Sequence, residues 1–357
     1  MTDTSAGRGV VNVAEINPHA PRPFTFTEPA LCLRDSIRKL GYACELHVNR
    51  ADTAQRCIVL GALPPNLPAV EQLDAGKAVI YNFEQLGSAQ SATVTGHDYL
   101  AWLRRWVVAD YHGANIAWLA RHGDTEHGVY ELPLVPSDAI AWRPDLPYAP
   151  TVDVLFYGTL NERRQRIIDA LRAAGLVVEI VAGSFGEELA PALKRARLVL
   201  HVHFYETGLF PVTRILQPVA QGVPVVCEQS VFSKLSDWSA SGIVFAPYER
   251  IVDACKRLAA ADAEREIRAR RNREFAAGID FATPFARIMD ALDAVPVPDA
   301  EIEKMLQAEA QALPPEAHLA APAFKIAERH PGQGRYGKWI VGLLVLFSLY
   351  TIWQSMR

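Results

Sequence analysis

The feature that most constrains this chain is an alternation of strand and helix patterns that occurs twice. Short apolar runs alternate with segments of helical periodicity over residues 10–135, and the same alternation returns over residues 152–292. Strands separated by helices form parallel sheets, because a parallel connection needs a crossover long enough to hold a helix. The sequence therefore predicts an α/β protein with two Rossmann-like domains that face a cleft.

Apolar runs and turn residues set the bounds of the predicted elements. The first alternation contains predicted strands at Val10–Val13, Ala43–Val48, Cys57–Leu60, Lys77–Tyr81 and Val129–Val135, and predicted helices at Glu28–Leu40, Tyr99–Val107 and Ala114–Ala120. The second contains predicted strands at Val152–Phe156, Val177–Val181, Leu198–His203, Val223–Cys227 and Ile243–Phe245, and predicted helices at Glu162–Ala173, Glu187–Ala196, Val212–Ala220, Tyr248–Ala261, Asp262–Ala276 and Thr283–Leu292.

Prolines mark the predicted boundaries between domains. Four of them (Pro136, Pro144, Pro147 and Pro150) separate the two alternations, which predicts an N-terminal domain over residues 1–148 and a second domain over residues 149–293. Residues 294–335 are again rich in proline, with one amphipathic helix candidate at Ala300–Leu313. They are predicted to be a tether.

The C-terminal residues 336–357 have the character of a membrane anchor. Trp339–Met356 contains no charged residue, and as a helix it would span roughly 27 Å, close to the hydrocarbon thickness of a bilayer. Lysines and arginines are more frequent before this run than after it, which places the bulk of the chain in the cytoplasm. The sequence predicts a single-pass anchor over residues 337–356, the alternatives being a buried terminal helix or an amphipathic surface helix.

Composition excludes several classes of function. The 36 lysines and arginines are outnumbered by 40 acidic residues, so there is no basic excess and no nucleic-acid partner is expected. The 5 cysteines are scattered and form no CxxC pair, so neither a disulfide framework nor a zinc site is predicted. Buried thiols in a reducing compartment are expected instead, and no signal peptide opens the polar N-terminus.

The first motif with chemical meaning runs from Asp153 to Leu171. Gly158 directly follows a predicted strand, where a side chain would obstruct a ligand, and the next helix presents free N–H groups to the cleft. Arg163 and Arg164 lie in the first turn of that helix, where a cation opposes the helix dipole unless an anion is bound. A diphosphate suits these guanidinium groups, while a solvated basic face is the alternative.

The second motif runs from Leu198 to Glu228. A predicted buried strand ends in polar and aromatic residues, at the sheet edge where doubly wound sheets bind ligands. Those residues are His201, His203, Phe204, Tyr205 and Glu206. Glu206 is predicted to accept hydrogen bonds from ribose hydroxyls, and Phe204 or Tyr205 to border a base. At least one histidine has a core position as its alternative, and no third ligand supports a metal site.

Together the two motifs resemble the donor-binding domain of GT-B glycosyltransferases, in particular family-1-like bacterial enzymes related to spore-maturation glycosyltransferases. The pattern R-x-x-E-x-x-A-x-G-x-P-V-V of those enzymes is matched by Arg214-Ile-Leu-Gln217-Pro-Val-Ala220-Gln-Gly222-Val-Pro224-Val-Val. The resemblance covers residues 75–290 and is strongest over residues 152–228. In such enzymes the glutamate of this pattern binds the donor ribose, and this chain has Gln217 there.

The resemblance implies a glycosyl transfer from a nucleotide-diphospho-sugar, without a metal or another cofactor. The implied donor-binding residues are Gly158, Arg163, Arg164, His203, Tyr205, Glu206, Arg214 and Gln217. With the anchor, it implies a place at the bacterial inner membrane, a glycan, polysaccharide or lipid-linked acceptor, and polysaccharide-assembly proteins as partners. The alternatives are a catalytically inactive scaffold of such an assembly, which Gln217 favours, and a nucleotide-sensing module.

Polar residues also follow predicted strands and loops of the N-terminal domain. Glu84, Asp110 and His112 lie in loops expected to face the cleft, which makes them candidates for acceptor binding or base catalysis. A structural role is the alternative for Asp110, which is placed to cap the helix that contains Asn115.

Overall fold

The structure is a computed structural model that describes residues 8–17, 26–63, 66, 70–87, 99–122, 125–204, 208–230 and 237–295. Residues 8–295 belong to one compact unit, Met1–Val295. Residues 296–357, which include the predicted anchor and all but the first two residues of the predicted tether, lie outside the described residues. No helix within the described ranges has both the length and the apolar character required to cross a bilayer.

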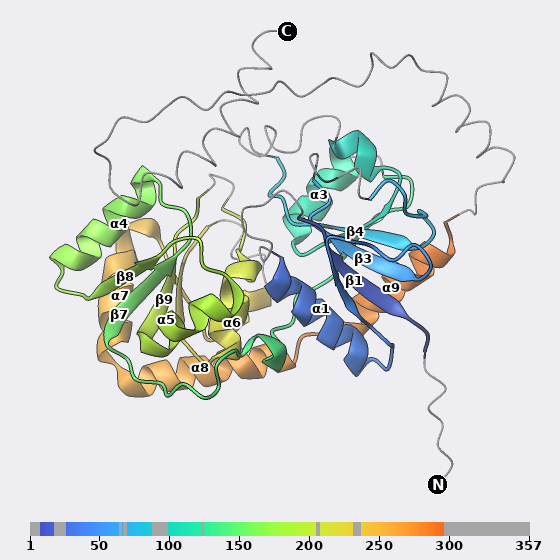
Figure 1. The fold of residues 1–357 in the computed structure, drawn as a ribbon. Helices are drawn as coiled ribbons and strands as arrows, with labels where there is room; N and C mark the ends of the chain where they lie inside the picture. The colour runs from blue at the N-terminus through green and yellow to red at the C-terminus, as the bar shows by residue number, and fades with distance from the viewer. Residues whose placement is uncertain are drawn as a thin grey trace, which may run out of the picture. The chain divides into compact units, whose positions relative to one another are not determined.

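The N-terminal lobe is built on a parallel sheet of six strands with the order β2-β1-β3-β4-β5-β6 (Figure 1). Its strands are β1 (Val11–Glu15), β2 (Leu46–Val48), β3 (Arg56–Leu60), β4 (Ala78–Asn82), β5 (Val107–Asp110) and β6 (Val129–Glu131), and its helices include α1 (Thr27–Lys39) and α3 (Gly113–His122). The runs RCIVL and AVIYN form central strands because β-branched and aromatic side chains fit a pleated surface buried on both faces.

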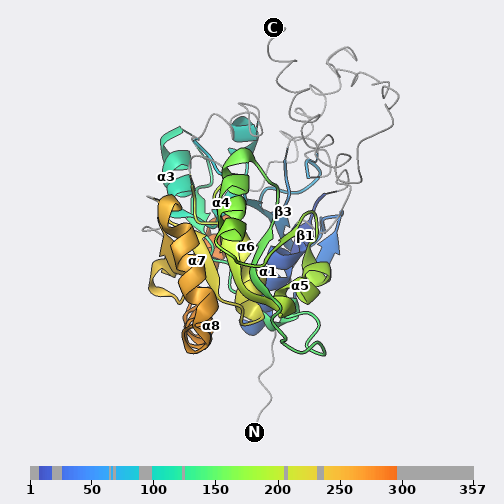
Figure 2. The same ribbon diagram turned by 90° about the vertical axis from the view of Figure 1, so that its left-hand side faces the viewer.

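The second lobe holds a parallel sheet of five strands with the order β11-β10-β9-β7-β8. Its strands are β7 (Val152–Tyr157), β8 (Val178–Val181), β9 (Ala196–His201), β10 (Val225–Glu228) and β11 (Val244–Ala246), and its helices include α4 (Glu162–Ala173), α5 (Ala190–Arg195), α6 (Val212–Ala220), α7 (Ile251–Ala260) and α8 (Asp262–Ala277). Side chains of α4 and α7 join the core on one face of this sheet, and those of α5 and α6 on the other (Figures 1 and 2).

The last helix, α9 (Ala282–Asp293), corrects the predicted boundary between the domains. It packs against β4, β5 and β6 of the first sheet, although it follows the second lobe in sequence (Figure 1). Phe285 meets Tyr42 edge to face at a centroid distance of 5.4 Å, and Asp293 forms an ion pair with Arg56. Residues 149–293 are therefore not one lobe in space, because their final helix completes the first.

The sequence analysis was wrong about one central strand. Residues 107–110 form β5, which is buried along its whole length, whereas the predicted helix Tyr99–Val107 ran into its first residue. Only the first part of that predicted helix is helical. The other strands and helices predicted within residues 10–292 are present, α4 and α6 with the predicted bounds and the others with shifted ones. All 5 cysteines are buried and free, as expected.

One apolar core joins the lobes. It contains residues of α1 and α9 from the N-terminal lobe and residues of α5 and α6 from the second lobe. The carboxyl ends of the strands carry the turns in which the candidate site residues lie.

Candidate functional site

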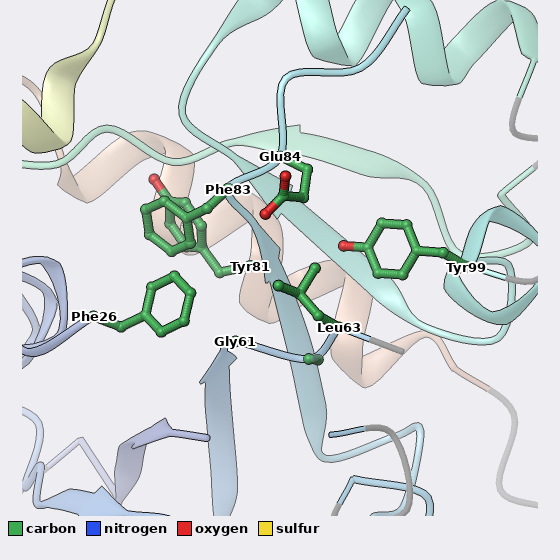
Figure 3. Close-up of a pocket in the computed structure, with 8 residues that line it drawn as sticks. Phe26, Gly61, Leu63, Tyr81, Phe83, Glu84 and Tyr99 are labelled. Carbon is green, nitrogen blue, oxygen red and sulfur yellow. The ribbon is translucent and has the colours of Figure 1, made fainter. Parts of the chain in front are cut away.

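A small hollow lies at the carboxyl ends of β3 and β4, with room for about one water molecule. It is lined by Phe26, Gly61, Ala62, Leu63, Tyr81, Phe83, Glu84 and Tyr99 (Figure 3). Gly61 has a φ of +80°, and a Cβ there would lie 2.2 Å from the carbonyl oxygen of Ile16. Only glycine therefore fits this turn.

Glu84 is the carboxyl group among the residues that line this hollow. Its main chain is fixed, because its carbonyl oxygen accepts hydrogen bonds from Asn82 Nδ2 at 3.0 Å and from Asn115 Nδ2 at 2.8 Å. Its carboxyl forms no hydrogen bond or ion pair with the residues that the structure describes, and burial raises its pKa to about 7. Such a group holds and releases a proton near neutral pH, as a general base must.

Aromatic rings form the wall beside Glu84. The Phe83 ring stacks on Tyr81 at a centroid distance of 4.5 Å and on Tyr111 at 5.9 Å, and it is tilted against Phe26 at 5.6 Å. These rings come from the ends of β4 and β5 and from the residue before α1. The wall presents flat apolar faces, which suit the C–H faces of a sugar or another ring.

Asp110 lies inside the fold rather than at the hollow. Its carboxylate accepts hydrogen bonds from Asn82 Nδ2 at 2.7 Å, from the His112 N–H at 2.8 Å and from Asn115 Nδ2 at 3.1 Å. Burial raises its pKa to about 7, while those hydrogen bonds oppose the rise. The structure thus gives Asp110 a positioning role, because it binds the two asparagines that fix the Glu84 main chain.

His112 is buried at the start of α3. Its Nδ1 accepts the N–H of Ala114 at 3.0 Å, so the neutral ring carries its proton on Nε2, and burial lowers its pKa. The structure therefore brings Glu84, Asp110 and His112 to one edge of the first sheet, but only Glu84 lines the hollow.

In the second lobe, Gly158 and Arg214 lie together at the carboxyl end of β7. Gly158 has a φ of +120°, and a Cβ there would approach Arg214 Nη1 to 2.9 Å. The Arg214 guanidinium lies 5.8 Å from the centre of the Tyr157 ring. Among the described residues it forms no hydrogen bond or ion pair. The sequence predicts a diphosphate site at Gly158, and the resemblance implies Arg214 as one of its residues; the structure brings the two together at this sheet edge.

Arg163 has an anionic partner within the protein. Its guanidinium forms two hydrogen bonds with the Glu228 carboxylate, one of them 2.6 Å long, and lies 4.0 Å from the centre of the Tyr248 ring. Glu228 also accepts the N–H of His203 at 2.9 Å. The expected anion beside the first turn of α4 is thus a side chain at the end of β10.

Arg164 is buried, and its guanidinium donates to two main-chain carbonyl groups. Nε donates to Val202 at 2.9 Å and Nη1 to Thr159 at 2.6 Å. Asn161 caps the helix by accepting the N–H of Arg164. Arg164 therefore ties the ends of β7 and β9 together, so its described contacts are structural.

The histidines of the second motif are both buried, and burial lowers the pKa of each. His203 Nε2 lies 3.0 Å from the Glu228 carbonyl oxygen and must donate, because a carbonyl only accepts. Tyr205 and Glu206 lie outside the described residues. No group of three potential metal ligands occurs in the described ranges.

Gln217 is fully buried on α6. Its Nε2 donates to the Gly186 carbonyl oxygen at 3.0 Å, and its Oε1 has no hydrogen-bond partner in the described part of the chain. The Gly186 N–H in turn donates to the Glu28 carboxylate at 2.9 Å.

Several residues of the site were not singled out from sequence, among them Asn82, Glu228, Tyr157 and Glu28. Asn82 and Glu228 end buried strands, so the rule that selected Glu206 could have found them. Tyr157 and Glu28 carried no such signal, because their roles depend on contacts with α6 and with the Gly186 turn.

Comparison with known protein families finds a match within the second lobe. Residues 162–290 match the family model described as glycosyl transferase-like. Two uncharacterized proteins of Acanthamoeba polyphaga mimivirus are similar over shorter stretches: L138 is 30% identical over 103 residues and L140 is 29% identical over 104 residues. Each stretch is 28% of this chain, and the two stretches span 12% and 34% of the respective relatives.

A solved structure has the same fold across both lobes. An alpha-glucosyltransferase in complex with UDP and DNA has a TM-score of 0.50, at 10% identity, over 79% of this chain and 98% of that chain. WaaG, a glycosyltransferase involved in lipopolysaccharide biosynthesis, has a TM-score of 0.48, at 13% identity, over 80% of this chain and 100% of that chain. The predicted two-lobed GT-B fold is confirmed, and the predicted transmembrane helix lies outside the described residues.

Proposed function

We propose that this chain transfers a sugar from a nucleotide-diphospho-sugar to an acceptor hydroxyl. The observation that carries the proposal is the Arg214 guanidinium above Gly158, a cation without an ion pair in the described part of the chain. The match of residues 162–290 supports it, since those residues include Arg214. The similar alpha-glucosyltransferase has UDP bound, which supports a nucleotide donor.

In this proposal the bond between the sugar's anomeric carbon and the diphosphate oxygen breaks, and a nucleoside diphosphate leaves. Arg214 neutralises the charge that develops on the leaving oxygen. The acceptor binds at the aromatic wall beside Glu84. Its hydroxyl oxygen forms the new bond to the anomeric carbon, and the hydroxyl proton goes to Glu84. Asp110, Asn82 and Asn115 hold the Glu84 main chain in place.

The proposal is tested by titrating purified protein with UDP-, GDP- and ADP-sugars and following binding and hydrolysis. We expect one of the three to bind with a Kd below 1 mM. Arg214→Ala should weaken that binding about tenfold or more, since it removes a charge-assisted contact worth about 1.5–3 kcal/mol. Arg172→Ala, an exposed change in the last turn of α4, is the matched control. If none of the three nucleotide sugars binds at millimolar concentration, the hypothesis of a nucleotide-diphospho-sugar donor is wrong.

Gln217 favours a second candidate, a catalytically inactive scaffold. An amide lies where the resembling enzymes have a carboxylate, and its Nε2 already donates to Gly186. A scaffold would keep its cellular function when Arg214 or Glu84 is replaced and would lose it on removal of residues 337–357. An enzyme would lose its function with either cleft substitution.

We further propose that residues 337–356 anchor the chain to a bacterial inner membrane, and that the acceptor is a glycan, polysaccharide or lipid-linked. The uncharged run Trp339–Met356 supports the anchor. No nucleic-acid partner and no metal are proposed. The full chain should sediment with membranes and stay there in 1 M salt, while a chain that ends at Val295 should remain in the supernatant. Release of the full chain by salt would refute the anchor.

A further inference from the structure

The first turn of α1 contacts both candidate sites. Phe26, directly before the helix, lines the hollow that contains Glu84. Glu28, two residues later, is buried, and its Oε1 accepts the N–H of Gly186 from the second lobe at 2.9 Å. Glu28 therefore belongs to the N-terminal lobe but forms its hydrogen bond with the other lobe.

Gly186 is also hydrogen-bonded to α6, the helix that carries Arg214. The Gly186 carbonyl oxygen accepts a hydrogen bond from Gln217 Nε2 at 3.0 Å. Gln217 and Arg214 are three residues apart on α6, so they lie on the same side of that helix, and α1 packs against α6. Glu28, Gly186 and Gln217 thus form a bridge from α1 to the helix that carries Arg214.

Glu28 also acts on Arg214 through charge. Burial raises the pKa of Glu28, whereas the Gly186 N–H and the Arg214 charge oppose the rise. Tyr157, whose hydroxyl donates to the Arg214 carbonyl oxygen, lies within reach of both charges. Arg214 has no ion pair among the described residues, and the bridge from Glu28 through Gly186 to Gln217 brings the Glu28 carboxylate toward the side of α6 that carries Arg214.

We propose that Glu28 is a positioning residue for the transfer: it balances the Arg214 charge before the donor binds, and the donor diphosphate displaces it from that role. The inference rests on the proposed nucleotide-sugar donor. It makes Glu28 a competitor of the diphosphate for Arg214, and it links donor binding to the contact between α1 and the second lobe.

The test uses Glu28→Gln in the full chain, because the amide oxygen still accepts the Gly186 N–H while the charge is gone. We expect UDP, GDP or ADP, whichever the wild type binds, to bind about three- to tenfold more tightly, since one unit charge at partly buried separations changes binding by that order. Glu187→Gln removes a charge from the exposed neighbour of Gly186 and should leave the Kd unchanged. Glu28→Ala should also bind more tightly, with a lower Tm.

A merely structural role for Glu28 predicts an unchanged Kd in Glu28→Gln, and that result, or weaker binding, overturns the inference.

A second measurement does not depend on the donor. In a double-mutant cycle with Arg214→Gln, the loss of Tm in the double variant should be smaller than the sum of the single losses by about 2 °C or more. If the wild type binds no nucleotide, the proposed function fails, and a non-additive cycle still supports the charge pair. Additive losses overturn it.

Discussion

Burial raises the pKa of the Glu84 carboxyl to about 7, and no hydrogen bond from a described residue opposes that rise. The group is therefore costly to ionise in the folded protein. The folded pKa exceeds the ordinary value of 4.5, so folding favours the protonated acid, and this residue lowers stability progressively as the pH rises from about 4.5 to about 7. A carboxyl that destabilises its own fold at neutral pH is typical of a functional group.

Glu84→Gln should therefore stabilise the protein at pH 8 by about 2–3 kcal/mol and have little effect at pH 4. The same change should abolish transfer, and the wild-type rate should fall as the pH drops below about 7, because the protonated acid cannot accept the hydroxyl proton. Urea denaturation at the two pH values measures the first effect. Glu71→Gln, on an exposed carboxylate, is the control. Equal destabilisation at both pH values would contradict this account of Glu84.

Asp110 has a similarly raised pKa but a different environment, because three donors surround its carboxylate. Asp110→Asn places an amide N–H against donors from Asn82 or Asn115. We expect a loss of about 2–3 kcal/mol of stability, since a buried donor then lacks an acceptor. Denaturation at pH 8 measures it. A neutral effect would show that the network does not depend on the carboxylate.

The sequence indicated which residues end up at the edges of the sheets, but not which way they face. Glu84 and Asp110 each lie at or just after the end of a buried strand, and the pattern alone treats them alike. The difference depends on Asn115, which comes from α3 and binds both Asp110 and the Glu84 main chain. Arg163 is a similar case, because its partner Glu228 is 65 residues away in the sequence.

At the scale of elements, α4 shows how local signals position the sheet edge that carries Gly158. Asn161 begins the helix as its N-cap and accepts the Arg164 N–H at 2.9 Å. The predicted bounds Glu162–Ala173 are confirmed, because the cap, the helical periodicity and Gly175 all act locally. The helix Tyr99–Val107 failed because the run VVAD is too short for periodicity to separate a buried strand from a helix.

Asn161→Ala should lower stability by about 1 kcal/mol, the usual contribution of an N-cap side chain. Asn161→Asp keeps an oxygen acceptor at the same position and should retain most of that stability. Thermal denaturation distinguishes the two variants. Because the cap fixes the main chain next to Gly158, we also expect the alanine variant to bind a donor nucleotide more weakly. Equal stability of both variants would argue that α4 is held by packing alone.

At the scale of the whole molecule, the return of α9 to the first sheet joins the lobes a second time. The strand–helix alternation predicted two lobes, and its repetition was sufficient for that. The alternation could not predict that residues 282–293 pack on β4, β5 and β6. The pattern of an amphipathic helix shows which of its faces is apolar, but not which sheet that face will cover. Phe285, Ile288 and Met289 are buried there.

A chain that ends at Val295 should therefore fold with nearly the Tm of the full chain, since Met1–Val295 is one compact unit. A chain that ends at Gly278 should lose much more stability or aggregate, because the face of the first sheet under α9 becomes exposed and the Arg56–Asp293 ion pair is lost. Phe285→Ala within the longer chain separates packing from length and should cost about 3–5 kcal/mol. If the Gly278 truncation instead folded with an unchanged Tm, the N-terminal lobe would be complete without α9, and the contacts with Tyr42 and Arg56 would add nothing to its stability.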